Sequence, residues 1–346
     1  MLDDLKLIHE RDPQDALGIA ERQWQQFRQS LVPSPAFHTD HVYNVVYVGM
    51  GGSALPALLV SSWPVLSEPF EIVRGYDIPN YVDSDTLFIA SSYSGNTEET
   101  LQAIDQAAAK NAQIVIITSG GKLADLARTQ NYPLITIPKA KQARYTLPYM
   151  IKALLVLLEQ VGLVSRDSIT TKLEKTAGFL KQAMQPWLAT APTASNQAKQ
   201  IALEVIGKSV VVYAGPKLWP AAYKWKINFN ENAKQIAWAN QYPEFNHNEF
   251  IGWTEQPVQK PYAVIDLRSS LEHPRIQKRF EVTERLLSGQ RPAPIVIQAQ
   301  GGDIVEQVLW TIALGDFVTI YTALLSGLNP TPLGLVEKFK QIMDME

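Results

Sequence analysis

Short apolar segments that alternate with helical stretches constrain the fold of this chain more strongly than any other feature of its sequence. The first such segments lie at 42–48, 70–73, 86–90, 114–118 and 134–137. Between them are stretches with helical periodicity, at 53–60, 98–109 and 122–128. Continuous apolar strands separated by helices are typical of a parallel sheet that is covered on both faces.

The alternation starts again after a mainly helical region at 147–190. Further strands are expected at 209–213, 262–266 and 294–298, and helices near 273–287 and 303–325. The sequence therefore predicts an α/β protein with two successive halves, although we detect no sequence repeat between them. The expected divisions are an N-terminal helical segment at 1–37, a first subdomain at 38–165, a helical linker at 166–197 and a second subdomain at 198–346.

Composition excludes several classes of protein. The chain has 346 residues, a net charge of −3 and no long basic run, so it lacks the electrostatic signature of a nucleic-acid or membrane-surface binder. It has no cysteine, which excludes thiol nucleophiles, disulfides and thiolate metal sites. The N-terminus is acidic and does not resemble a signal peptide. Charged residues such as Lys152 and Asp316 interrupt the longest apolar stretches, which predicts buried helices in a soluble, cytoplasmic protein.

A glycine-rich loop from Gly49 to Ser53 follows the first expected strand. Gly51 and Gly52 would let a ligand approach the backbone closely, and Ser53 would begin a helix. The N-terminus of a helix offers unpaired N–H groups to an anion. This loop is therefore a candidate phosphate-binding element.

A second loop, from Ser91 to Glu99, follows the strand expected at 86–90. It places the hydroxyl groups of Ser92, Ser94 and Thr97 at the start of another helix. Hydroxyl groups together with helix N–H groups can bind phosphate without a cation.

Simpler interpretations of both loops are open. A Gly-Gly-Ser sequence after a strand is often only a tight turn, and Ser94 or Thr97 could be a helix N-cap. The residues from Gly49 to Ala54 also match a loose dinucleotide-binding fingerprint, with Glu71 near the place of a ribose-binding acid. That match leaves the hydroxyl-rich loop unexplained.

Taken together and in this order, the two loops resemble the sugar-phosphate loops of the sugar isomerase (SIS) family. The motifs that carry the resemblance are Gly51-Gly52-Ser53 and Ser92-x-Ser94-Gly95-x-Thr97-x-Glu99. The resemblance implies two SIS-type α-β-α sandwich subdomains, each with a parallel, flavodoxin-like sheet, together with N-terminal and linker helices.

A carboxylate and a histidine in Asn-rich surroundings are the candidate catalytic groups of the second half. Glu231 is followed sixteen residues later by His247, which stands in Asn246-His247-Asn248. Asparagine is a poor residue for helix interiors and can orient neighbouring polar groups. From the residues alone, Glu231 could equally be a surface acid of a helix, and His247 a loop residue that caps a helix.

This arrangement resembles the bifunctional phosphoglucose/phosphomannose isomerase branch of the SIS family over nearly the whole chain. The resemblance implies that Glu231 is the catalytic base and that His247 assists ring opening. It also implies that Arg144 stabilises an enediolate.

The same resemblance assigns a catalytic lysine near the C-terminus. Lys338 fits its position, seven residues after Thr331, which matches a threonine that permits the mannose epimer. Lys340 is an alternative to Lys338.

Aldose–ketose isomerisation needs the groups that these candidates would supply. It moves a proton between C2 and C1 through a cis-enediol(ate), which requires a base, a ring-opening acid/base pair and a fixed positive charge. Glu231, His247 with Lys338, and Arg144 form such a set. We expect glucose 6-phosphate and fructose 6-phosphate as substrates, and also mannose 6-phosphate. We expect no metal or other cofactor, since no two histidines have ligand spacing.

Two other functions are open. A non-catalytic SIS regulator would keep the phosphate loops, but it would not need Glu231 and His247. A dinucleotide oxidoreductase would use the glycine loop instead. The family resemblance further implies a homodimer in which His247 reaches the site of the partner subunit, and it implies no nucleic-acid or membrane partner.

Overall fold

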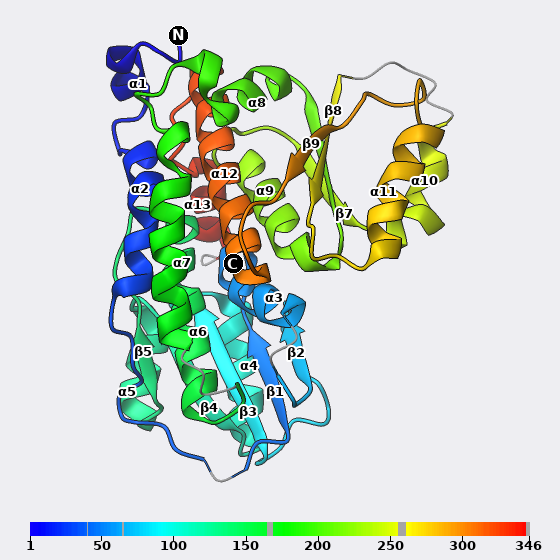
Figure 1. Ribbon diagram of the computed structural model, residues 1–346. Helices are drawn as coiled ribbons and strands as arrows, with labels where there is room; N and C mark the ends of the chain where they lie inside the picture. Colours follow the sequence, from blue (N-terminus) through cyan, green and yellow to red (C-terminus); the bar gives the residue numbers. More distant parts are fainter. Residues whose placement is uncertain (40, 64–65, 165–168, 255–260, 344–346) are drawn as a thin grey trace. The chain divides into compact units, whose positions relative to one another are not determined.

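The computed structural model describes residues 1–39, 41–63, 66–164, 169–254 and 261–343 (Figure 1). The chain packs into two compact units, and each contains one sheet. The N-sheet unit comprises Arg22–Gln182 and Gly301–Val308. The C-sheet unit comprises Met1–Glu21, Ala183–Gln300 and Leu309–Glu346.

Five parallel strands form the sheet of the N-sheet unit, in the order β2-β1-β3-β4-β5. This is the strand order of flavodoxin-like folds. All seven residues of β3 are buried, as expected of a central parallel strand that is covered on both faces. The strands are β1 (Asn44–Val48), β2 (Phe70–Val73), β3 (Thr86–Ser92), β4 (Gln113–Thr118) and β5 (Leu134–Thr136).

In the N-sheet unit, helices follow the carboxyl ends of β1, β3 and β4. In the core, Val46, Phe88 and Ile116 of neighbouring strands pack with Ala103 and Ile104 of a helix. The helical elements are η1 (Gln23–Arg28), η2 (Gly51–Ala54), α3 (Leu55–Ser62), α4 (Glu98–Ala109), α5 (Gly121–Gln130), η3 (Ala143–Tyr145), α6 (Leu147–Gln160) and α7 (Ile169–Ala183).

Four parallel strands form the sheet of the C-sheet unit, in the order β7-β6-β8-β9. The strands are β6 (Ser209–Ala214), β7 (Ala237–Gln241), β8 (Tyr262–Arg268) and β9 (Ile295–Gln298). The helical elements are α1 (Leu5–Arg11), α2 (Ala16–Arg22), η4 (Gln185–Trp187), η5 (Thr193–Ser195), α8 (Gln197–Val205), η6 (Pro216–Leu218), α9 (Trp219–Glu231), η7 (Glu244–His247), α10 (Glu249–Gly252), α11 (Pro274–Leu286), α12 (Ile304–Leu325) and α13 (Gly334–Met343). Of α12, residues 304–308 are assigned to the N-sheet unit.

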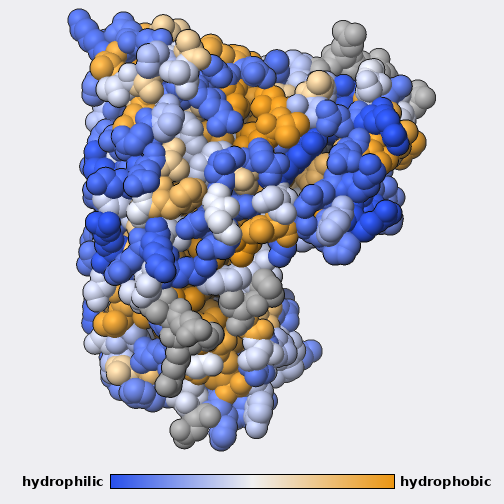
Figure 2. Space-filling view, viewed as in Figure 1, coloured by the Kyte–Doolittle hydropathy of each residue, from blue (hydrophilic) through white to orange (hydrophobic). Residues whose placement is uncertain are grey.

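The helix α11 illustrates how the sequence pattern sets burial in the C-sheet unit. Its buried residues are Ile276, Phe280 and Thr283, which recur at helical spacing. Figure 2 shows hydrophilic residues across the outer face of this helix. Phe280 packs in the core with residues of β6 and β8.

The two parallel α/β halves confirm the predicted fold class, with one strand that the sequence did not reveal. β7 lies at the edge of its sheet and has the sequence Ala-Trp-Ala-Asn-Gln, so it lacks the apolar run of the other strands. Trp238 in this strand is 50% exposed. The four-part domain division stays a prediction.

The helix α12 is long and apolar enough to cross a membrane by composition, and it is the one such helix within the described ranges. Of its most apolar window, 94% is buried inside the structure. Burial therefore accounts for its composition, as expected for the apolar stretch that Asp316 interrupts. The boundary expected between the first subdomain at 38–165 and the linker at 166–197 falls on residues 165–168, which lie outside the described part of the chain.

Candidate active site

The two predicted phosphate loops meet in the N-sheet unit. They follow β1 and β3, which are neighbours in the sheet, so their carboxyl ends lie side by side. The amide of Tyr93 donates a hydrogen bond to Ser53 Oγ at 3.1 Å, which joins the loops directly. The hydroxyl of Tyr47 also anchors the first loop, because it donates a hydrogen bond to the carbonyl oxygen of Ser53 at 2.8 Å. Gly51 has a φ of +50°, a conformation that favours glycine.

The hydroxyl groups predicted to bind phosphate form a cluster. Ser92 Oγ lies 2.7 Å from Thr97 Oγ1 and 3.4 Å from Ser94 Oγ, and it accepts from the amide of Gly95 at 3.2 Å. Thr97 occupies the N-cap position of α4, but its side chain makes no capping hydrogen bond. Thr97 therefore stands at the N-cap position, but the prediction that its side chain caps the helix is wrong. Its hydroxyl faces that of Ser92 instead.

Gly95 is required by the shape of the second loop. Its φ is +72°, and a Cβ atom there would lie 1.7 Å from the carbonyl oxygen of Gly120. The loop is held from the other side by Asn96, whose Oδ1 accepts from the amide of Lys122 at 3.0 Å. These contacts fix the hydroxyl cluster at the N-terminus of α4, where helix N–H groups favour an anion.

Arg144 lies beside the glycine loop of the same unit. Its Cα is 4.0 Å from the place where a Cβ on Gly52 would stand, and the residue is only 3% exposed. The guanidinium carbon lies 4.7 Å from the centre of the Tyr145 ring. The N-sheet unit thus brings together both predicted loops and a fixed positive charge.

Glu231 is the last residue of α9 in the C-sheet unit, and it is half-buried. A buried polar network fixes this helix against α12. Lys224 Nζ lies 2.7 Å from Asp316 Oδ1, with side chains 1% and 6% exposed, and it donates to Asn228 Oδ1 at 2.5 Å. One residue beyond Glu231, Asn232 Nδ2 donates to Thr319 Oγ1 at 3.0 Å.

His247 ends η7 and is exposed, while its neighbours anchor the loop. Asn246 Nδ2 donates to Thr283 Oγ1 at 3.0 Å, and Asn246 Oδ1 accepts from Arg279 at 3.1 Å. On the other side, Glu249 accepts from Asn240 Nδ2 at 2.6 Å and from the Tyr213 hydroxyl. The Asn-rich surroundings noted in the sequence therefore hold the backbone around His247.

Thr331 and the candidate lysines belong to the C-terminal segment of the C-sheet unit. Thr331 is 5% exposed, and its amide donates to Asn329 Oδ1 at 3.0 Å. Lys338 and Lys340 are both exposed on α13. Residues two apart in a helix do not share a face, so the two lysines point in different directions.

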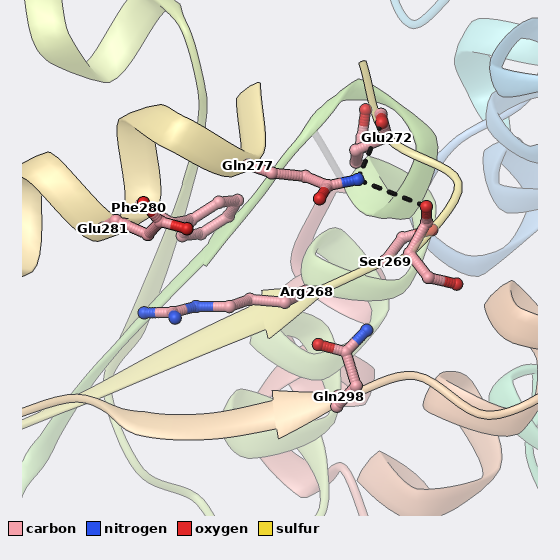
Figure 3. A pocket seen from close by; sticks show the side chains of 8 residues that line it. Arg268, Ser269, Glu272, Gln277, Phe280, Glu281 and Gln298 are labelled. Carbon is pink, nitrogen blue, oxygen red and sulfur yellow. Dashed lines mark hydrogen bonds between the residues drawn. The ribbon is translucent and has the colours of Figure 1, made fainter. Parts of the chain in front are cut away.

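A cavity of about 380 Å³ lies at the carboxyl ends of β8 and β9, and sequence reasoning did not point to it. Figure 3 shows Gln277 reaching across it; its Nε2 donates to the carbonyl oxygens of Ser270 at 3.2 Å and Glu272 at 3.0 Å. The described residues that line it include none predicted as site residues. They are Arg268, Ser269, Ser270, Glu272, Gln277, Phe280, Glu281 and Gln298.

Glu272, which lines this cavity, is 5% exposed. Its Oε1 accepts from the amide of Lys217 at 2.7 Å, at the start of the turn that leads into α9. Burial raises the pKa of the Glu272 carboxyl above its ordinary value, and the hydrogen bond from Lys217 partly opposes that rise. A side chain on Gly215 would overlap the same carboxylate, so this corner has no room for a further group.

Among the residues that the structure describes, no group of three or more His, Asp or Glu side chains is arranged to hold a metal ion.

Comparisons with known proteins place the chain in a family. Residues 44–160 match the SIS domain family, and residues 194–343 match the family described as bacterial phospho-glucose isomerase C-terminal SIS domain. A bifunctional phosphoglucose/phosphomannose isomerase of Caldicellulosiruptor bescii is 35% identical over 87% of this chain and 89% of its own length. One of the same name from Aquifex aeolicus is 30% identical over 92% of this chain and 93% of its own length.

Solved structures share the fold. A glucose-6-phosphate isomerase like protein from Thermus thermophilus has a TM-score of 0.62 at 18% identity, and the match covers 97% of this chain and 99% of that one. At this identity the likeness concerns the fold alone. The matches to the curated relatives extend over most of both chains at 30% identity or more. The chain belongs to the bifunctional phosphoglucose/phosphomannose isomerase family.

Proposed function

We propose that this protein interconverts glucose 6-phosphate and fructose 6-phosphate, and also accepts mannose 6-phosphate. Membership of the family makes it a sugar-phosphate isomerase. The observation that carries the proposal is the hydroxyl cluster of Ser92, Ser94 and Thr97 at the N-terminus of α4. Such a cluster suits the phosphate group that the proposed substrates share.

The N-sheet unit would bind and polarise the substrate. The phosphate would accept hydrogen bonds from Ser92, Ser94 and Thr97; Gly51 and Gly52 would supply backbone N–H groups, and Ser53 its hydroxyl. Arg144, almost fully buried, would stabilise the negative charge of the enediolate. Because the phosphate does not react, its binding energy can orient the sugar.

The C-sheet unit would supply the proton transfers. Glu231 would move a proton between C2 and C1 through a cis-enediol(ate). His247, with Lys338 or alternatively Lys340, would open the sugar ring. Thr331 would contact the sugar where the glucose and mannose epimers differ.

We further propose that the protein is a homodimer to which His247 contributes across the interface. The exposure of His247 and the fixed backbone around it support this assignment. The non-catalytic regulator is less favoured, because relatives that match over about nine-tenths of the chain carry enzyme names.

Turnover by the purified protein is the decisive experiment. We expect fructose 6-phosphate to give glucose 6-phosphate, detected directly by NMR, in protein treated with a chelator. Mannose 6-phosphate and a ketopentose phosphate should be assayed in parallel. Absence of turnover with all three would refute the catalytic proposal and leave a sugar-phosphate binder. A spectroscopic change on titration with NAD(H) would instead favour the oxidoreductase interpretation.

A further inference from the structure

We infer that Lys234 is a positioning residue that ties the helix end carrying Glu231 to the chain segment carrying Thr331. The inference rests on the proposed function, in which both residues act on the sugar. Lys234 stands in Glu231-Asn232-Ala233-Lys234, yet none of the proposed catalytic steps uses it.

The ammonium group of Lys234 is surrounded by main-chain carbonyl oxygens from two segments. Its Nζ lies 2.8 Å from Glu231 O and 3.3 Å from Asn232 O, at the end of α9. It also lies 3.1 Å from both Asn329 O and Pro330 O, so its three N–H groups are shared among four carbonyl oxygens. The last carbonyls of a helix lack helical partners and carry partial negative charge, so a cation there stabilises them.

The backbone of Lys234 is unusual for a lysine. Its φ is +54°, in the left-handed region, where glycine or asparagine commonly ends a helix. A side chain is rarely retained in this conformation unless the surroundings need it. The four carbonyl contacts supply that need, because this backbone directs the ammonium at both segments.

The second segment leads directly to Thr331. Asn329 Oδ1 accepts from the Thr331 amide at 3.0 Å, and Asn329 Nδ2 donates to Gln14 Oε1 at 2.8 Å. The two carbonyls that Lys234 contacts in this segment thus belong to the residues immediately before Thr331. One ammonium group therefore sets the spacing between the backbone of the proposed base and that of the proposed epimer-contacting threonine.

The rest of α9 does not depend on this contact. Lys224 and Asp316 hold the body of the helix, and Asn232 bonds to Thr319. Loss of the Lys234 ammonium should therefore leave the C-sheet unit folded and loosen only the link to residues 329–331. An effect of Lys234 on the position of Glu231 and Thr331 can therefore be measured apart from an effect on the stability of the C-sheet unit.

The test compares Lys234→Met, which keeps the aliphatic stem, with Lys234→Arg, which keeps the charge. For Lys234→Met we expect kcat with fructose 6-phosphate to fall about 10- to 100-fold, since a misplacement near 1 Å can have that effect. KM should change much less, because the phosphate loops are untouched. The ratio of mannose to glucose product should also shift. Lys234→Arg should recover most of the lost kcat.

Two further variants test whether a loss of kcat comes from the carbonyl contacts of Lys234 and not from misfolding or from the removal of any lysine. Asparagine tolerates the left-handed backbone, so Lys234→Asn should fold even if Lys234→Met folds poorly. Its kcat should fall as far as that of Lys234→Met. Lys110→Met is the matched control, because Lys110 Nζ also donates to a carbonyl oxygen, that of Asn80 at 2.7 Å, in the N-sheet unit. It should leave kcat and the product ratio unchanged.

Amide hydrogen exchange gives a readout that does not need activity. We expect faster exchange at Thr331 in Lys234→Met and Lys234→Asn, but not in Lys110→Met. If the wild-type enzyme is active and these variants match it in kcat, product ratio and exchange, the inference is wrong. If the wild type shows no turnover, the proposed function is wrong, and exchange at Thr331 alone decides whether Lys234 ties the two segments.

Discussion

Ser53 Oγ accepts a hydrogen bond from the amide of Tyr93 at 3.1 Å, which joins two loops that are forty residues apart in the chain. The bond orients the Ser53 hydroxyl toward the loop that carries Ser92. The two family motifs are therefore parts of one structure at the carboxyl ends of β1 and β3. Sugar-phosphate binding should depend on both loops.

Replacing the hydroxyls of the second loop should weaken phosphate binding. A hydrogen bond to a charged group contributes about 1.5–3 kcal/mol, so Ser92→Ala or Thr97→Val should raise KM about 10- to 100-fold. Inorganic phosphate should inhibit these variants less, measured as a higher inhibition constant. Ser61→Ala is a suitable control, because Ser61 bonds only to helix carbonyls of α3. Unchanged KM and phosphate inhibition in both loop variants would contradict this assignment.

Removing the proposed base should abolish turnover while leaving binding intact. For Glu231→Gln we expect kcat to fall by about 10²–10⁴-fold, the usual contribution of a positioned base, with little change in affinity for fructose 6-phosphate. Steady-state kinetics and calorimetric binding measure the two effects. Glu204→Gln, an exposed acid on α8, should behave as the wild type. A Glu231→Gln enzyme with nearly normal kcat would assign the base elsewhere.

Gly95→Ala should destabilise the N-sheet unit. A side chain at φ +72° costs about 1–2 kcal/mol, and displacing the Gly120 carbonyl adds about 1–3 kcal/mol. Chemical denaturation should show the loss. Gly178→Ala is the matched control: Gly178 lies within α7 with no atom within 4 Å of an added Cβ, so stability should rise by about 0.5–1 kcal/mol. Equal stability of the two variants would contradict the assigned role of Gly95.

The buried ion pair of α9 and α12 should be costly to break from one side. Lys224→Met removes the cation beside Asp316 in the core, so we expect a loss of about 3–5 kcal/mol in the free energy of unfolding. Lys224→Met combined with Asp316→Leu should recover much of it, because no buried charge is left from the pair. A double variant no more stable than Lys224→Met, measured by urea unfolding, would argue against this account.

Glu272 should make stability fall as pH rises. Because burial raises its folded pKa above the ordinary 4.5, the folded protein binds the proton more tightly than the unfolded chain. The resulting stabilisation is full below pH 4.5 and is lost as pH rises through the folded pKa. Glu272→Gln keeps an acceptor for Lys217 and should remove this dependence, so its stability relative to the wild type should increase with pH.

Glu281, on the helix α11 that follows Glu272, provides a control of opposite sign. The hydrogen bond from Lys278 lowers the pKa of the exposed Glu281 carboxyl, so its contribution is present above pH 4.5 and lost as pH falls. Glu281→Gln should therefore lose stability relative to the wild type as pH rises. Urea unfolding between pH 4 and 8 measures both variants. The same pH trend in both would contradict the assignment of the Glu272 shift to burial.

Several parts of the site could be predicted because they depend on local sequence. The hydroxyl loop is recognisable from residue types and spacing directly after an apolar strand. The edge strand β7 escaped prediction because Ala237–Gln241 is half-exposed and shows no apolar run. The positioning contacts of Lys234 were also invisible, since its carbonyl partners at Asn329 and Pro330 lie about a hundred residues away.

By itself, the sequence determined the alternating α/β architecture and predicted the two phosphate loops, while the candidate catalytic groups were implied by the family resemblance. Periodicity and residue type are properties of neighbouring residues, so a pattern can reveal them. Only the tertiary structure decided that the Thr97 hydroxyl faces Ser92, that Lys224 pairs with Asp316 and that Lys234 joins α9 to the C-terminal segment. These contacts depend on how helices and strands pack, and side-chain direction is settled only when that packing removes water and brings distant polar groups together.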